Sequence, residues 1–206
     1  YWPFTFIPEF SDEAEDMLKL FRRIVDNGKH LSFMAHFNHP VEMDNAAVQE
    51  AIYNIRQTGA EIRTQAPVLK NITDDARIWQ EMWTKQVNLG LVPYYMFIER
   101  ETGPYAYFEK PISEVYKIYR DAIKYTGSLA KTVTAPVMSA SMGKVHVMGV
   151  IENPLDNQKY FMMQYVRHRD VEETYKPFLT HYDEKATWFN QLVRTDADMI
   201  LTLDKE

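Results

Sequence analysis

Hydrophobic positions along the chain alternate between a helical and a strand-like spacing. Apolar residues recur at helical intervals from Met17 to Val25, and the mainly apolar segment 31–37 follows as a buried strand. The same order returns further along the chain. Helices are predicted at about 44–58, 74–88 and 113–126, and strands at 62–69, 92–98 and just before Lys144.

Gly28, Gly59 and Gly90 recur at a regular interval, and each closes a predicted helix just before a strand. A repeated strand–helix unit predicts parallel strands joined by right-handed crossovers. The strands are hydrophobic without strict alternation, which predicts that both of their faces are covered. The fold class is α/β, as a doubly wound sheet or a β/α barrel. The predicted strands are too few to close a complete barrel, so we expect the later part of an open, partial barrel over residues 1–143.

The pattern changes after Lys144. Apolar runs at 145–151 and 160–166, separated by a turn at 153–157, predict a β-hairpin. A polar tail follows, with a short helix expected near 184–193 and a last strand near 199–203. Residues 144–206 are therefore expected to form a C-terminal hairpin and tail segment.

Composition narrows the functional classes. The formal net charge is −6, which gives a nucleic-acid role no electrostatic support. Apolar runs are too short to span a membrane. The chain has no cysteine, which excludes disulfides, thiolate metal sites and cysteine nucleophiles within it. The first residues lack a basic leader segment and look cut from a longer chain. We expect a cytoplasmic protein, and a homo-oligomer because a partial barrel exposes sheet edges.

Candidate site residues gather where strands of a parallel β/α fold end, because sites form at that edge. They are His36, His39, Arg63, Gln65, Arg100 and Lys144. Several are cationic, which favours an anionic ligand. Lys144 follows a loop of small residues among apolar neighbours, where an amine loses its charge easily.

Each candidate also has a simpler interpretation. Lys144 could be a solvated lysine at a strand start, and the two histidines could cap a loop. Arg63 and Gln65 could satisfy neighbouring backbone groups, and Arg100 could form a surface ion pair with a flanking glutamate. Metal binding by His36 and His39 is not expected, because Glu42 is the one acidic residue close by in sequence.

Four segments, in order, resemble the lysine 2,3-aminomutase family of radical SAM enzymes. They are HFNHPVE at 36–42, Gly59 with Gln65 and VLKNITDD at 68–75, Pro93-Tyr94-Tyr95, and Gly143-Lys144. The resemblance covers about residues 1–150 and, more loosely, the hairpin. It implies a partial β/α barrel and a 1,2-amino shift by radical chemistry. It also implies pyridoxal phosphate on Lys144, with Gln65, His36 and His39 near the cofactor and Arg63 and Arg100 near an amino-acid substrate.

Two departures from the family pattern matter. The family binds a 4Fe–4S cluster and S-adenosyl-L-methionine through a CxxxCxxC loop, and this chain has no cysteine. Lysine-using members place aspartates at the positions of Arg100 and Val137, so lysine is not the expected substrate. Two hypotheses follow: the C-terminal part of an amino-acid 2,3-aminomutase, inactive as an isolated piece, or a binding module without radical chemistry. An upstream CxxxCxxC motif would favour the first.

Overall fold

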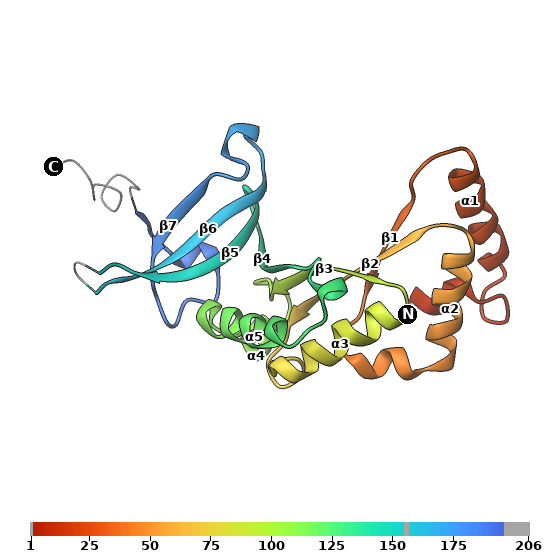
Figure 1. The fold of residues 1–206 in the computed structure, drawn as a ribbon, viewed down its shortest axis with the longest axis horizontal. Helices are drawn as coiled ribbons and strands as arrows, with labels where there is room; N and C mark the ends of the chain where they lie inside the picture. Colours follow the sequence, from red (N-terminus) through yellow and green to blue (C-terminus); the bar gives the residue numbers. More distant parts are fainter. Residues whose placement is uncertain (1, 155–156, 196–206) are drawn as a thin grey trace. The chain divides into compact units, whose positions relative to one another are not determined.

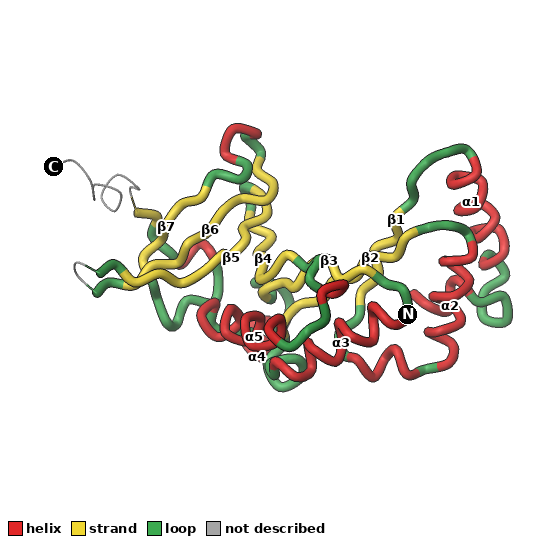
Figure 2. Tube along the Cα trace, viewed as in Figure 1, coloured by secondary structure: helices red, strands yellow, loops and turns green. Residues whose placement is uncertain are grey.

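The structure is a computed structural model that describes residues 2–154 and 157–195. The described part of the chain is an α/β fold with a mixed sheet in the strand order β1-β2-β3-β4-β5-β6-β7-β8. The sheet is not closed, because β1 and β8 are its two ends. Figure 2 shows helices and strands alternating up to β4 and strands predominating after it.

Two compact units are present. Unit 1 consists of Tyr1–Ala66, Arg77–Tyr94 and Ala122–Val133. Unit 2 consists of Pro67–Ala76, Tyr95–Asp121 and Thr134–Glu206.

The strand–helix repeat predicted from the sequence is confirmed. Its elements, in chain order, are η1 (Trp2–Phe6), α1 (Ala14–Asp26), β1 (Ser32–His36), η2 (Pro40–Asp44), α2 (Ala46–Gln57), β2 (Glu61–Val68), α3 (Ala76–Asn88) and β3 (Val92–Ile98) (Figure 1). Strands β1 and β2 pair in parallel, as do β3 and β4 (Thr134–Ala140). Gly28, Gly59 and Gly90 have φ values of 75°, 84° and 75° after α1, α2 and α3. This left-handed conformation is favourable for glycine and ends each helix.

The expectation that both faces of the parallel strands are covered fails for β2, although four consecutive residues of β4 are buried. Buried and half-buried positions alternate strictly along β2. Thr64 is buried, and its hydroxyl donates to the Gln86 side-chain oxygen on α3 at 2.7 Å. Arg63 and Gln65 point to the opposite face and are half-buried. Helix packing on one face explains the burial, so the other face of β2 is free to carry polar side chains.

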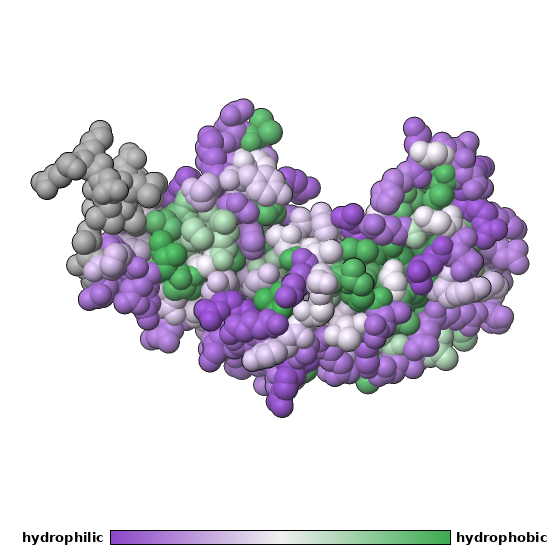
Figure 3. All heavy atoms as spheres, in the orientation of Figure 1, coloured by the Kyte–Doolittle hydropathy of each residue, from purple (hydrophilic) through white to green (hydrophobic). Residues whose placement is uncertain are grey.

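An aromatic cluster packs η1 against β1 and the residue that follows it in unit 1. Trp2 lies 5.2 Å from the Phe33 ring and 5.5 Å from the Phe37 ring, and Phe6 lies 5.1 Å from Phe33. The Trp2 indole also donates to the His36 carbonyl at 3.2 Å. Helix α1 places half-buried apolar residues on one face, and the drawn surface over it is mainly hydrophilic (Figure 3).

Unit 2 is built around antiparallel strands. Strand β5 (Gly143–Glu152) pairs with β4 and with β6 (Lys159–His168), and β6 pairs with β7 (Pro177–His181). The β5–β6 hairpin was predicted and is confirmed. Val145, Val147, Phe161 and Met163 are fully buried between these strands and their neighbours, and each such side chain contributes about 1.5–3 kcal/mol by burial.

The remaining elements of the second half of the chain are the 13-residue helix α5 and several short elements, where η denotes a 3₁₀-helix. They are α4 (Tyr105–Phe108), α5 (Ile112–Lys124), η3 (Ser128–Ala130), η4 (Val171–Glu173), η5 (Phe189–Gln191) and β8 (Arg194–Thr195). The short helix expected near 184–193 is present only as the three-residue 3₁₀-helix η5. Instead, residues 184–186 bind α5: Ala186 accepts from the Ile112 amide at 2.8 Å and Glu184 accepts from the Ser113 hydroxyl at 3.3 Å. The strand expected near 199–203 lies outside the described residues.

Candidate functional site

The turn between β4 and β5 builds the candidate site in unit 2. Register pairs Ser139 with Lys144 and Ala140 with Gly143. A Cβ added to Gly143 would lie 1.9 Å from the Arg167 carbonyl oxygen, which no side chain tolerates. Glycine is required here because the β6 backbone passes so close. The same approach sets Arg167 opposite Lys144 in the β5–β6 pairing.

Lys144 is half-buried, and its amine lies against two aromatic rings of β3. The Nζ atom is 4.5 Å from the Tyr95 ring centroid and 4.4 Å from that of Phe97. The pKa of Lys144 is lowered from its ordinary value, chiefly because burial disfavours the ammonium. The guanidinium groups of Arg167 and Arg100 lower this pKa further by repulsion. Burial and the nearby arginines therefore make the Lys144 ammonium easier to deprotonate than that of an exposed lysine.

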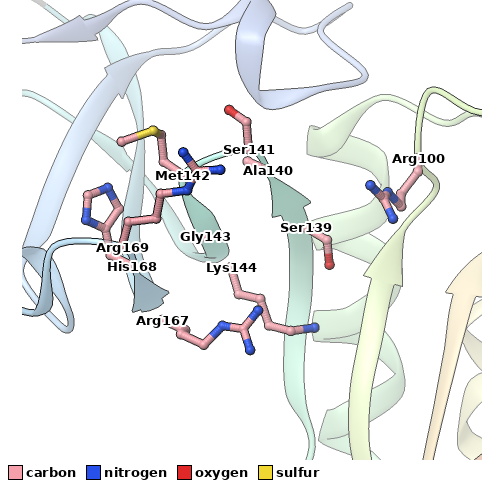
Figure 4. Close-up of a pocket in the computed structure, with 10 residues that line it drawn as sticks. All are labelled: Arg100, Ser139, Ala140, Ser141, Met142, Gly143, Lys144, Arg167, His168 and Arg169. Atoms are coloured by element: carbon pink, nitrogen blue, oxygen red, sulfur yellow. The ribbon is translucent and has the colours of Figure 1, made fainter.

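A cavity of about 660 Å³ surrounds this turn, which we call the cationic pocket (Figure 4). Its lining residues are Arg100, Ser139, Ala140, Ser141, Met142, Gly143, Lys144, Arg167, His168 and Arg169. No acidic residue of the described ranges 2–154 and 157–195 lines it. Among the described residues, no carboxylate lies within ion-pair distance of Arg100, Lys144, Arg167 or Arg169. In a chain with 29 acidic and 23 basic side chains, this concentration of cations indicates a site for an anionic group.

Arg100 faces the cationic pocket while its two glutamate neighbours do not line it. The Glu101 carboxylate instead accepts from the Asn190 side chain at 3.4 Å. Val137 lies on the Lys144 face of β4, because it is two residues before Ser139, and it is fully buried. The two positions that depart from the family pattern thus carry a guanidinium in the pocket and an apolar side chain next to it.

His146 is a further polar residue on the Lys144 face of β5. Its Nε2 lies 3.0 Å from the Ala135 carbonyl oxygen, to which it donates. Its Nδ1 atom is buried and has no hydrogen-bond partner among the described residues. Burial lowers the pKa of His146, and the hydrogen bond to Ala135 opposes this shift only in part.

The other predicted residues lie in unit 1. His36 pairs with Gln65 in the β1–β2 register, so the two are neighbours on one face. The His36 Nε2 is 2.8 Å from the Asn38 side-chain oxygen. Arg63 forms an ion pair with Glu61, and its guanidinium lies 5.0 Å from the Tyr94 ring centroid. Arg63 therefore contacts side chains rather than the backbone groups suggested from the sequence.

His39 and Glu42 form a capping box at the start of η2. The His39 Nδ1 accepts from the Val41 amide at 3.3 Å. The Glu42 carboxylate accepts from the amides of Asn38 at 2.6 Å and His39 at 2.9 Å. The spacing of His39, Pro40 and Glu42 therefore has a local structural role. No group of three or more His, Cys, Asp or Glu residues in the described ranges could hold a metal ion.

Arg167 and Arg169 were not predicted from the sequence, and neither were the Tyr95 and Phe97 rings as neighbours of Lys144. Counting pairs outward from the predicted 153–157 turn would have placed Lys144 opposite residue 166 or 167, so the hairpin did carry a signal for Arg167.

Among the described helices, none has the length and apolar character to cross a membrane.

Two curated relatives match the chain, and both are named putative L-lysine 2,3-aminomutase from Aquifex aeolicus (strain VF5). The first is 28% identical over 183 residues, which cover 88% of this chain and 47% of the relative. The second is 28% identical over 88 residues, which cover 43% of this chain and 22% of the relative. No family model matches. The resemblance to a lysine 2,3-aminomutase-like family is confirmed at this low identity, and the chain spans about half the length of the curated relatives it matches.

Proposed function

We propose that this chain is part of an amino-acid aminomutase in which Lys144 carries pyridoxal phosphate. One observation carries the proposal: a half-buried amine with a lowered pKa lies between aromatic rings and arginines in the cationic pocket. The relatives named putative L-lysine 2,3-aminomutase support the reaction class. We also propose that the open parallel strands are the later part of a larger β/α barrel.

The residues of the cationic pocket fit the chemical needs of pyridoxal phosphate. The cofactor bonds to a neutral lysine amine, and burial together with Arg167 and Arg100 lowers the pKa of Lys144 toward that form. It carries a phosphate, and Arg100, Arg167 and Arg169 offer cations that form no ion pair within the described residues. When bound, pyridoxal phosphate supplies a carbonyl carbon that reversibly takes up an amino nitrogen.

The side chains around Lys144 have separable tasks in this proposal. Lys144 would hold the cofactor through its amine nitrogen, and the same amine would hold a proton whenever the cofactor is not bonded to it. Tyr95 and Phe97 shield the amine from water on one side and stabilise its cationic form only modestly, by about 0.5–2 kcal/mol. The guanidinium of Arg167 opposes that protonation. The rings favour the charged form of the amine and Arg167 disfavours it, so the Lys144 amine can change between its charged and neutral forms.

Gln65, His36 and His39 are proposed to contact the cofactor, and Arg63 the substrate, on the strength of the family resemblance. An iron–sulfur cluster is a different case, because the chain has no cysteine to provide thiolate ligands. The residues present do not fit that group, and no step is assigned to it or to S-adenosyl-L-methionine here.

The substrate is proposed to be an amino acid with an anionic or neutral polar side chain. Arg100 offers a fork of donors suited to a carboxylate, and it lines the pocket without a carboxylate partner in the described ranges. Buried Val137 offers nothing to recruit an ammonium. A lysine side chain would bring a second ammonium to a pocket that is already cationic.

Titration of the full-length protein with pyridoxal phosphate tests the proposal. We expect an absorbance band near the edge of the visible range in the wild type and in Lys131→Ala, which removes an exposed lysine of the same chain. Lys144→Ala should show no such band. Equal uptake by Lys144→Ala would refute the assignment. Anion binding without this band would instead favour a binding module.

A further inference from the structure

Arg167 and Arg169 occupy one side of the cationic pocket, at the end of β6 and just after it. Figure 4 shows them with His168 beside the Gly143 turn, and Arg100 on the other side of the pocket. The Arg169 amide donates to the Met142 carbonyl at 3.0 Å, which fixes the Arg169 backbone to that turn. Two guanidinium groups from one short segment are thus held next to the small-residue turn that precedes Lys144.

Several half-buried cations elsewhere in the chain have acidic partners. Lys85 is 2.7 Å from the Asp44 carboxylate, Lys110 is 2.5 Å from that of Glu114, and Arg63 pairs with Glu61. Arg167 and Arg169 have no such partner within the described ranges, and both are exposed to solvent. Repulsion among like charges is unfavourable unless an anion offsets it. The gathering of these cations in one pocket, rather than the lack of a partner at any one of them, therefore favours a ligand that supplies the negative group.

The close packing at Gly143 fixes the geometry of this segment. The register pairs Gly143 with His168 and Lys144 with Arg167. Because the Arg167 backbone lies against Gly143, this segment has little freedom to move away from the turn. Because the backbone that carries Arg167 and Arg169 is held in place, binding an anion here would order only their side chains, which limits the conformational entropy lost.

We propose that Arg167 and Arg169 form an anion subsite for a phosphate or carboxylate group beside Lys144. The hydroxyls of Ser139 and Ser141 add donors to the same pocket. The subsite stands on the geometry of the pocket alone. Only the source of its anion rests on the proposed function, as the phosphate of the cofactor or a carboxylate of the amino-acid substrate.

Binding of inorganic phosphate to the full-length protein, free of cofactor and at constant ionic strength, tests the subsite by calorimetry. Arg167→Gln and Arg169→Gln should each weaken phosphate binding by about three- to ten-fold, as expected for one exposed charge-assisted contact. Arg23→Gln, which removes the same charge from the exposed surface of α1, should leave it unchanged. Arg167→Lys keeps the charge and should lose less affinity than Arg167→Gln.

Two competitors identify the source of the anion. Pyridoxamine 5′-phosphate carries the cofactor's phosphate but has no aldehyde for Lys144, and glutarate carries carboxylates only. Arginine-dependent competition by the first assigns the subsite to the cofactor phosphate, and competition by glutarate alone assigns it to a substrate carboxylate. If Arg167→Gln fails to fold, Arg169→Gln decides, because Arg169 follows the end of β6 with an exposed side chain.

No phosphate binding, or equal binding by Arg169→Gln, Arg23→Gln and the wild type, would overturn the subsite. Cofactor uptake on Lys144 with no arginine dependence of anion binding would overturn the subsite alone. Arginine-dependent phosphate binding without cofactor uptake on Lys144 would overturn the proposed function alone.

Discussion

Replacing Gly143 by alanine tests how the cationic pocket is built. The new Cβ would lie 1.9 Å from the Arg167 carbonyl oxygen and 2.9 Å from the Arg167 carbonyl carbon and the His168 Cα. All three atoms belong to backbone, so no side-chain rotation relieves the clash. Strand β6 must move away from β5, and the pairs Gly143–His168 and Lys144–Arg167 are disturbed.

These contacts set the expected loss in the free energy of unfolding. Overpacking costs about 1–3 kcal/mol, and each weakened backbone hydrogen bond adds about 0.5–1.5 kcal/mol. We therefore expect Gly143→Ala to lower the free energy of unfolding by about 2–4 kcal/mol. The same displacement should weaken phosphate binding, because Arg167 and Arg169 move with β6.

Gly149→Ala is the matched control in the same strand. A Cβ at Gly149 would meet the Tyr116 hydroxyl at 3.6 Å and the Met162 methyl at 3.8 Å, which are ordinary contacts. The free energy of unfolding should change by less than about 1 kcal/mol, with a small gain possible because alanine restricts the unfolded chain. Urea titration of both variants decides between them. Equal stability of Gly143→Ala and the wild type would refute the close approach of β6 and the account of the pocket.

Three further predictions concern single side chains. Because the pKa of Lys144 is lowered in the folded state, the unfolded state binds more protons at pH values between the folded-state pKa and 10.5. The free energy of unfolding should therefore rise with pH across that window. Urea titrations at several pH values should show a smaller rise for Lys144→Met. The lowered pKa of His146 predicts an NMR titration midpoint below 6.5 and a stability that falls as pH drops through 6.5; a midpoint above 6.5 would contradict its burial. The full-length enzyme should turn over glutamate faster than lysine, and Arg100→Asp should shift the preference toward lysine; faster turnover of lysine with no gain from Arg100→Asp would refute the role of Arg100.

Local pattern was sufficient to predict the elements whose side chains alternate or recur over many residues. Strands β2 and β3 and the β5–β6 hairpin lie within two residues of their predicted bounds. Strand β7 was missed, because its five residues contain a proline and their pairing with β6 depends on contacts distant in sequence. The polar segment 184–193 has helix-compatible residues, but its backbone groups bind α5 instead.

The candidate site also contains residues that local pattern could predict and residues that it could not. Lys144 and Arg100 were predicted because parallel strands direct their ends toward a common edge. Arg167 and Arg169 were missed because they lie at the end of β6 and just after it, and β6 runs antiparallel to β5. Their position next to Lys144 follows only from the register of the β5–β6 hairpin. Tyr95 and Phe97 have the composition of core residues, and their contact with the Lys144 amine depends on the pairing of three strands.

Covalent trapping of pyridoxal phosphate on Lys144 is the most direct test of the central claim. The full-length protein would be incubated with the cofactor at pH values from 6 to 9, reduced with borohydride, digested and mapped by mass spectrometry. The lowered pKa of Lys144 predicts that this lysine is labelled at a lower pH than exposed lysines such as Lys131, and that Arg167→Gln shifts its labelling to higher pH. Labelling spread evenly over exposed lysines, with Lys144 no more reactive than Lys131, would contradict the claim.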